Sequence, residues 1–213
     1  MDNKFDTCST LHTTLQPIPG SVYDWHLNTG RLGSYRDGMN SRVHAITTND
    51  VEVPEAVFKV TCCVPTLSLY EQIGTVRTSN RRVSGLPTVR EHFGSCAQDA
   101  NSFFFFGFQL DRLREARSPQ ERQQVQSLIA EVQRIQKDIG AKHAWRSQWV
   151  IDSKVARQLA RYNFMGLSAA FELTADVIEE THAVLDLEQA GNILFDRFGY
   201  VCLADPVAQT FSC

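Results

Sequence analysis

The chain of 213 residues lacks most of the patterns that reveal a function directly. It has no Walker phosphate loop, no G-x-G-x-x-G, no G-x-S-x-G and no H-E-x-x-H. Its six cysteines include no C-x-x-C pair and no zinc spacing, so we assign no metal site and expect mostly buried thiols. The common nucleotide, hydrolase and zinc-protease signatures are therefore excluded.

Long apolar runs and an excess of positive charge are also missing. No run approaches the length of a membrane span, and the N-terminus has neither the basic start nor the apolar centre of a signal peptide. We therefore expect a cytoplasmic protein without a membrane partner. The net charge is −3 and the pI about 6.1, which argues against general nucleic-acid binding.

The composition is that of a globular protein, with 43% hydrophobic and 21% charged residues. The pattern predicts one α+β domain over residues 1–213, in which a mixed or antiparallel sheet from the N-terminal half packs against a helical C-terminal half. Residues 1–20 read as an arm that is mobile or packed on a neighbour. The run FFFFGF at 103–108 must be covered on both faces, by a core or by another subunit.

Strand and turn signals dominate the N-terminal half. The alternation of Tyr23, Trp25 and Leu27 predicts a hairpin over 21–35. The next segment, 36–50, reads as irregular, and 55–64 reads as a strand that Pro65 ends. A short helix over 66–74 and then a loop are expected.

Helical signals dominate the C-terminal half. Ser118, Pro119 and Glu121 form a capping-box pattern before a helix over 119–139 that Gly140 ends. Further expected elements are helices over 153–165 and 168–184, a last helix that Asp186 caps and Gly199 ends, and a strand over 200–204.

The segment 72–90 is rich in arginine and hydroxyl groups. It carries Arg77, Arg81, Arg82 and Arg90, and no acid lies between Glu71 and Glu91. Guanidinium forks and hydroxyls suit phosphate or carboxylate, and glycines let backbone N–H groups approach the same anion. The pattern indicates either a solvated basic loop or an anion-binding loop.

Two smaller groups of residues have spacings that could carry chemistry. His92 and Cys96 lie four residues apart, a spacing that a thiolate–imidazole pair on a helix would need, but Gly94 weakens a helix there. Trp145 and Trp149 are one helical turn apart, which is more typical of a core than of a ligand platform.

The surroundings of the arginine segment resemble flavin-dependent thymidylate synthases. The matching residues are VPEAVFKV, then Gln72-Ile-Gly-Thr-Val-Arg77-Thr-Ser-Asn and Ser84-Gly85, which are similar to that family's Q-x-x-R-H-R-T-x-S and second serine. Later, Ser147-Gln148-Trp149-Val150-Ile151 looks like the family's A-Q-W-E-I. Thr75 and Val76 stand where the family has arginine and histidine.

This resemblance implies a nucleotide-binding enzyme that transfers a one-carbon group or hydride to a pyrimidine nucleotide through FAD, or a diverged relative. The implied cofactor-binding residues are Arg77, Ser79 and Gln72. The implied substrate-binding residues are Arg81, Arg82, Ser84, Gly85, Lys142 and Gln148. Sites shared between subunits in that family, together with the phenylalanine run, predict a homo-oligomer.

Two alternatives stay open. A non-enzymatic oligomeric assembly protein would use FFFFGF as its interface. A PAS-like ligand-binding sensory module would use 21–35 as its opening hairpin.

Overall fold

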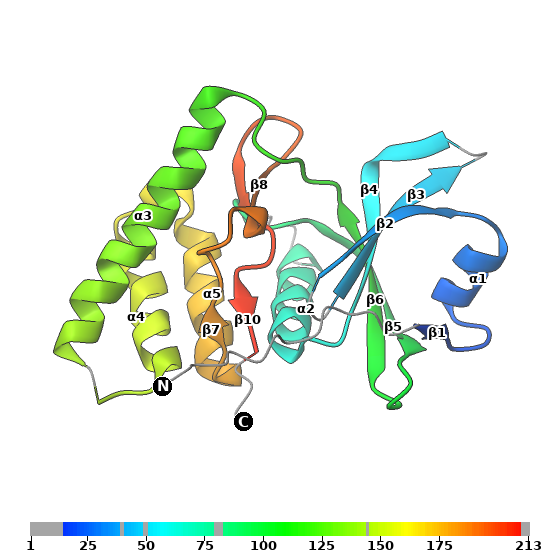
Figure 1. The fold of residues 1–213 in the computed structure, drawn as a ribbon, viewed down its shortest axis with the longest axis horizontal. Helices are drawn as coiled ribbons and strands as arrows, with labels where there is room; N and C mark the ends of the chain where they lie inside the picture. Colours follow the sequence, from blue (N-terminus) through cyan, green and yellow to red (C-terminus); the bar gives the residue numbers. More distant parts are fainter. Residues whose placement is uncertain (1–14, 39–40, 49–50, 79–82, 144, 210–213) are drawn as a thin grey trace, which may run out of the picture. The chain divides into compact units, whose positions relative to one another are not determined.

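The computed structural model describes residues 15–38, 41–48, 51–78, 83–143 and 145–209; side chains at 51–54 and 76–78 are not described. These residues form five α-helices and a curled antiparallel sheet of six strands (Figure 1), which confirms the α+β class. The chain divides into two compact units. Unit 1 comprises 1–62 and 90–110, and unit 2 comprises 63–89 and 111–213. The single domain expected from the sequence stays a prediction.

Unit 1 is built on the six-stranded sheet, whose β-branched and aromatic residues suit a half-buried pleated surface. Neighbouring strands are antiparallel where β1 meets β5 and where β3 meets β2 and β4. The strands in spatial order are β1 (Gln16–Pro17), β5 (Val89–Gln98), β6 (Phe104–Asp111), β4 (Val51–Thr61), β3 (Ser41–Thr48) and β2 (Leu32–Asp37).

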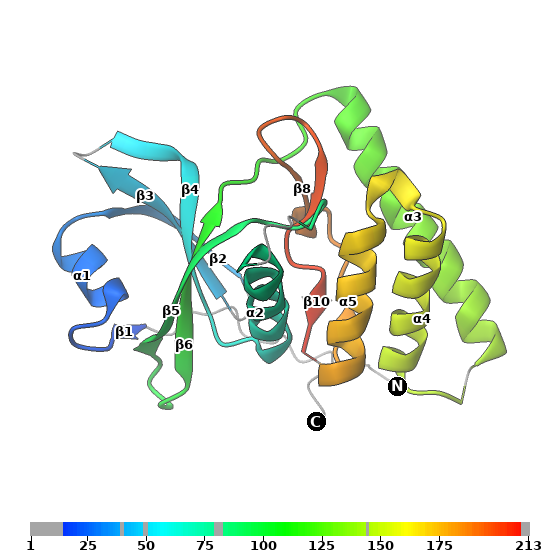
Figure 2. The same cartoon turned by 180° about the vertical axis from the view of Figure 1, so that it is seen from behind.

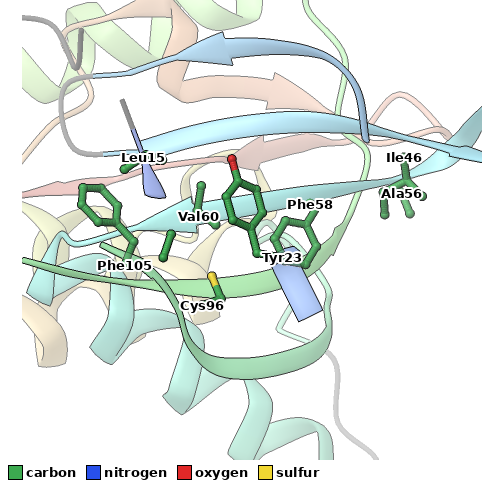
Figure 3. Packing of buried hydrophobic residues seen from close by; sticks show 9 residues of the cluster. Leu15, Tyr23, Ile46, Ala56, Phe58, Val60, Cys96 and Phe105 are labelled. Atoms are coloured by element: carbon green, nitrogen blue, oxygen red, sulfur yellow. The ribbon is translucent and has the colours of Figure 1, made fainter. Parts of the chain in front are cut away.

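The core of unit 1 gathers side chains from the sheet and from helix α1 (Val22–Asn28), as Figure 3 shows. Tyr23 of α1 stacks on Phe58 of β4 with ring centroids 5.9 Å apart, and both are almost fully buried. Leu15 also belongs to this cluster, and β1 pairs with β5. The part of the expected arm that the structure describes is therefore packed on the sheet.

The hairpin expected over 21–35 is wrong, because its first half is helix α1. Ser21 caps that helix, since its Oγ accepts a hydrogen bond from the Asp24 N–H at 3.2 Å. Of the three residues whose alternation predicted the hairpin, Tyr23 is buried, whereas Trp25 and Leu27 are 48% and 41% exposed. The segment expected to be irregular, 36–50, contains the end of β2 and the strand β3. The strand expected over 55–64 is confirmed up to Thr61, where β4 ends, whereas Val64 and Pro65, expected to close the strand, already belong to the next helix.

The described residues of unit 2 form four α-helices and two small antiparallel ladders (Figures 1 and 2). In both views α4 and α5 run side by side. The helices are α2 (Val64–Thr78), α3 (Pro119–Lys142), α4 (Gln148–Arg161) and α5 (Ser168–Thr181). The ladders pair β7 (Val184–Leu185) with β10 (Val207–Ala208), and β8 (Ile193–Phe195) with β9 (Val201–Leu203).

The long helix of the C-terminal half is confirmed, together with its start. Ser118 and Glu121 form the reciprocal capping box, and Pro119 opens the helix. Leu128, Val132 and Ile135 are fully buried. Gly140 does not end the helix, which continues to Lys142.

Other boundaries in this half differ from the expectation. The helix expected over 153–165 begins earlier, at Gln148. It ends earlier too, at Arg161, because Asn163 and Met165 adopt left-handed backbone angles. The helix expected over 168–184 is confirmed but ends at Thr181. The helix that Asp186 was expected to cap is wrong: its residues form a loop, the 3-10 turn Ala190–Asn192 and β8. The final strand is confirmed as β9.

Two earlier segments also need correction. The helix expected over 66–74 is longer at both ends, from Val64 to Thr78, so residues 75–78 are helical rather than loop. In the phenylalanine run, Phe105 and Phe108 are buried, whereas Phe103 and Phe104 are 65% and 54% exposed. Within unit 1, therefore, only part of this run is covered. Among the described helices, none is long and apolar enough to span a membrane.

Candidate functional site

Two polar segments of unit 2 meet where its small ladders adjoin. The first, Asp186–Asn192, links β7 to β8, and the second, Ala204–Pro206, links β9 to β10. The Asp186 N–H donates to the Pro206 carbonyl at 2.9 Å, and the Ala204 N–H donates to the Asn192 carbonyl at 2.8 Å. These backbone bonds hold both segments in one place.

Three half-buried polar side chains belong to these segments: Asp186, Asn192 and Asp205. The Asn192 Nδ2 donates to the Asp186 carbonyl at 2.8 Å, which closes the loop on itself. The same residue ends the 3-10 turn through its N–H, which donates to the Gln189 carbonyl at 3.0 Å. With its amide nitrogen used in this way, Asn192 keeps its Oδ1 as an acceptor or ligand.

Charge accumulates around Asp186. Burial raises the pKa of its carboxyl, the Asn192 amide lowers that pKa, and the negative charges of Asp205 and Glu188 raise it further. The net direction is upward from the ordinary aspartate value. A carboxylate with a raised pKa takes up a proton more readily, and a cluster of negative charge attracts a cation.

Helix α2 fixes the second segment from another side. The Thr66 Oγ1 donates to Asp205 Oδ1 at 3.0 Å, and the Tyr70 hydroxyl donates to the Ala204 carbonyl at 3.4 Å. Thr66 and Tyr70 are each 1% exposed. A buried hydroxyl of this kind sets the direction of the Asp205 carboxylate without adding charge.

The donor set suits a hard cation more than zinc. Among the described residues, no three His, Cys, Asp or Glu side chains stand close enough to hold a metal ion by themselves. Mg²⁺ is usually bound by one or two carboxylates together with substrate phosphates, rather than by a cage made only of protein. Asp205, Asn192 and Asp186 offer oxygen ligands of the type and number that this mode needs.

The residues expected from the sequence to bind ligand have other surroundings. Gln72 donates to Glu180 Oε2 at 2.8 Å and to the Ser68 hydroxyl at 3.3 Å. Gln148 donates to Asp152 Oδ1 at 2.8 Å. The two glutamines therefore contact different carboxylates, Glu180 on α5 and Asp152 on α4.

The structure describes the remaining expected residues to different extents. Lys142 ends α3 and is exposed, as is Ser84. Arg77 lies in α2, but its side chain is not described. Ser79, Arg81 and Arg82 lie outside the described residues.

Gly85 is a packing position. Its φ is +85°, and a Cβ there would lie under 3.0 Å from Leu167 Cδ2 and 3.3 Å from the Ala170 Cβ. Its carbonyl accepts the Leu203 N–H at 2.8 Å, which joins the turn to β9. The close approach and the positive φ therefore explain the glycine without a ligand.

The His92–Cys96 and Trp145–Trp149 pairs have surroundings that do not suit catalysis. His92 lies in strand β5 and stacks on Phe108, with ring centroids 4.4 Å apart. Cys96 is fully buried, and burial raises its pKa to about 12, which disfavours a thiolate. Trp145 is 72% exposed and not core, whereas Trp149 stacks on the His182 ring at 4.4 Å.

The sequence reading missed Asn192 and Asp205, and it treated Asp186 only as a helix cap. A usable signal was present. Asn192 lies six residues after Asp186 and directly before the apolar strand Ile193–Phe195. Asp205 follows the next strand, Val201–Leu203. No protein-family model matches the chain, and no curated protein matches it.

Proposed function

We propose that this protein transfers a phosphoryl group from a nucleoside triphosphate to a hydroxyl acceptor, with Asp186, Asn192 and Asp205 as its central residues. The observation that carries the proposal is the set of hydrogen bonds that join the loop Asp186–Asn192 to the segment of Asp205. In protein kinases, an aspartate and an asparagine of one catalytic loop act together with the aspartate of a following D-F-G segment.

The order of elements along the chain supports the same reading. Kinases place a lysine on a strand, in V-A-I-K, ahead of a helix and then of the catalytic loop. Here Val57–Lys59 lies in β4, α2 follows, and the residues Asp186, Asn192 and Asp205 come later in that order. Lys59 is 4% exposed, which is rare for a lysine and suits a fixed role.

The chain departs from the kinase pattern at several points. The spacing from Asp186 to Asn192 is one residue longer than from the aspartate to the asparagine of the kinase catalytic loop H-R-D-L-x-x-x-N. Val184-Leu185 stands where that loop has His-Arg. Pro206-Val207 follows Asp205 in place of Phe-Gly, and the sequence has no glycine-rich G-x-G-x-x-G. We therefore propose a diverged phosphotransferase. Asn192 and Asp205, for which the sequence alone indicated no metal site, are proposed as metal ligands.

Each central residue has a distinct role in the proposal. Asp186 accepts the proton of the acceptor hydroxyl as that oxygen bonds to the γ-phosphorus and the bond to the leaving diphosphate breaks, giving a phosphate ester and a nucleoside diphosphate. Asn192 and Asp205 supply oxygen ligands for Mg²⁺. When bound, that ion neutralises charge on the phosphate groups. The raised pKa of Asp186 suits a proton acceptor.

Binding and transfer assays test the proposal. Purified protein is titrated with Mn²⁺ and ATP, and transfer of the γ-phosphate to itself, to water or to added hydroxyl compounds is followed with labelled ATP. Asp186→Asn should lower turnover by roughly 10²–10⁴-fold, as expected for loss of a general base, with little change in ATP affinity. Asp205→Asn should weaken metal-dependent binding instead.

Asp196→Asn serves as the matched control. Asp196 belongs to the same unit, but its Oδ1 caps the β8–β9 turn by accepting from the Phe198 and Tyr200 N–H groups, a role an amide oxygen can keep. Turnover should therefore stay near wild type. A wild-type protein that neither binds ATP with metal nor transfers its phosphate would refute the proposal.

The flavin-dependent reaction on a pyrimidine nucleotide stays a separate prediction from the sequence. It expects a bound flavin absorption band in the purified protein. It also expects Arg77→Ala to weaken binding of pyrimidine monophosphates about ten- to a hundred-fold, since a charge-assisted hydrogen bond contributes roughly 1.5–3 kcal/mol. Calorimetry measures that change, and equal binding by wild type and variant would remove the prediction.

A further inference from the structure

A buried carboxylate outside the proposed site connects three elements of unit 2. Asp152 of α4 is 1% exposed. Its Oδ1 accepts hydrogen bonds from Gln148 Nε2 at 2.8 Å and from Gln136 Nε2, on α3, at 3.2 Å. Its Oδ2 accepts from the Leu185 N–H at 3.0 Å. We propose that Asp152 is a positioning residue that fixes the backbone in front of Asp186; this rests on the proposed phosphotransferase function.

The need for Asp152 follows from the geometry of β7. This strand has two residues and, in the part of the chain that the structure describes, one ladder neighbour, β10, with Leu185 opposite Val207. Successive N–H groups of a strand point to opposite sides, and the Asp186 N–H is the one that reaches β10, at the Pro206 carbonyl. The Leu185 N–H therefore points away from the ladder. Leu185 is 5% exposed, so Asp152 takes the place of a second neighbouring strand.

Two hydrogen bonds thus fix adjacent peptide groups from opposite sides. The Leu185 N–H is held by α4, and the Asp186 N–H is held by the Pro206 carbonyl next to β10. Loss of the bond to Asp152 frees one side of β7. The Asp186 carboxylate, which follows directly, then loses its fixed position relative to Asp205. Asp152 touches no reacting atom in this account and acts only through the backbone.

Stability explains why the buried Leu185 N–H has an acceptor, but not by itself why that acceptor is a carboxylate. Burial raises the pKa of Asp152, while the hydrogen bonds from Leu185, Gln148 and Gln136 lower it. Apolar residues of similar volume would avoid the cost of burying a charge, but they would leave the buried Leu185 N–H without its acceptor. A carboxylate differs from them by accepting several hydrogen bonds in fixed directions. An apolar side chain could not accept the hydrogen bond from the Leu185 N–H, and so could not hold β7 in this orientation.

The test compares Asp152→Ala with Ser153→Ala, the next residue of the same helix. Ser153 is 5% exposed, and its hydroxyl donates to Glu179 Oε1 at 2.6 Å, away from β7. Both variants should melt at lower temperature. Only Asp152→Ala should speed hydrogen exchange at the Leu185 and Asp186 amides of the nucleotide-free protein. It should also lower kcat by about 10- to 100-fold at nearly unchanged KM for ATP. This is the usual loss when a residue that orients a metal ligand through a hydrogen bond is removed.

Two more variants keep the test decisive. Asp152→Leu fills the space and removes the charge, so it should fold where the alanine variant does not, and still show fast exchange and low kcat. Asp152→Asn should recover most of both, because its oxygen can accept from Leu185 while the Gln136 or Gln148 amide turns to present its own oxygen.

The outcomes separate this inference from the proposed function. If Asp152→Leu folds, exchanges slowly at Leu185 and keeps its kcat, Asp152 is not a positioning residue. If the wild-type protein transfers no phosphate, the proposed function fails, and the exchange measurement alone decides whether Asp152 holds the backbone before Asp186. Slow exchange in both Asp152→Ala and wild type would then overturn the inference.

Discussion

Replacing Gly85 by alanine should destabilise unit 2 through two separable effects. The first is the backbone, since φ is +85° and an L-residue in the left-handed region costs about 1–2 kcal/mol more than glycine. The second is crowding, because the new methyl group would approach Leu167 Cδ2 and the Ala170 Cβ. Overpacking of a buried site costs roughly 1–3 kcal/mol. The two together give about 2–5 kcal/mol.

The crowding is not easily relieved. The contact falls on the end of the Leu167 side chain, which could in principle rotate, but Leu167 is 3% exposed and Ala170 is fully buried. A shift of the turn itself would strain the hydrogen bond from the Leu203 N–H to the Gly85 carbonyl. For a chain of this size, about 2–4 °C of melting temperature is lost per kcal/mol. The expected loss is therefore roughly 4–20 °C.

Gly166→Ala is the matched control for this experiment. Its φ is +76°, but nothing lies within 4 Å of the position of a Cβ, so only the backbone effect applies. Thermal and urea denaturation followed by circular dichroism should show a smaller loss for Gly166→Ala than for Gly85→Ala. Adding Leu167→Ala to Gly85→Ala should cost less than it does in the wild type. Equal losses for the two glycine variants would show that Leu167 moves aside freely, and the crowding argument would fail.

The remaining predictions concern stability, pH, thiol reactivity and assembly. Leu128→Ala, at a fully buried position of α3, should lower the free energy of unfolding by roughly 2–5 kcal/mol in urea titrations. Hydrogen bonding to Arg114 lowers the pKa of Glu121 to about 2. Its carboxylate therefore stabilises the fold above about pH 4.5, and this stabilisation is lost as the pH falls towards 2. In Glu121→Gln, the melting temperature should depend less on pH over that range. Cys96 should resist thiol reagents until the protein unfolds. Exposed Phe104 leads us to expect a homo-oligomer, and a 24 kDa monomer in light scattering would contradict this.

Elements with strong local signals were predictable from the sequence. Helix α3 begins where Ser118 and Glu121 form their reciprocal hydrogen bonds, and its buried residues recur at helical spacing. The strand of Phe58 and the final strand β9 were also recognisable from β-branched and aromatic content. In these segments, neighbouring residues supply most of what determines the structure.

Helix α1 shows where that reasoning fails. Tyr23, Trp25 and Leu27 alternate like one face of a strand, yet only Tyr23 is buried. The helix forms because Ser21 caps it and Tyr23 packs on Phe58, a residue far along the chain. Such a tertiary contact can override a local alternation in a segment of only seven residues.

The candidate site was hidden for the same physical reason. An aspartate before an apolar run is a good helix cap, and this fitted Asp186 as well as any functional role. Its surroundings are decided by bonds that no local pattern contains: the Asp186 N–H meets the Pro206 carbonyl, and the Asp205 carboxylate meets Thr66, 139 residues earlier. Gly85 is a further example, since its close approach to Leu167 is a contact that no local pattern contains, while its expected role in substrate binding stays a prediction. In unit 2, long-range hydrogen bonds bring Asp186 and Asp205 into one site. Motif spacing in the sequence does not contain these bonds, so it could not identify the site.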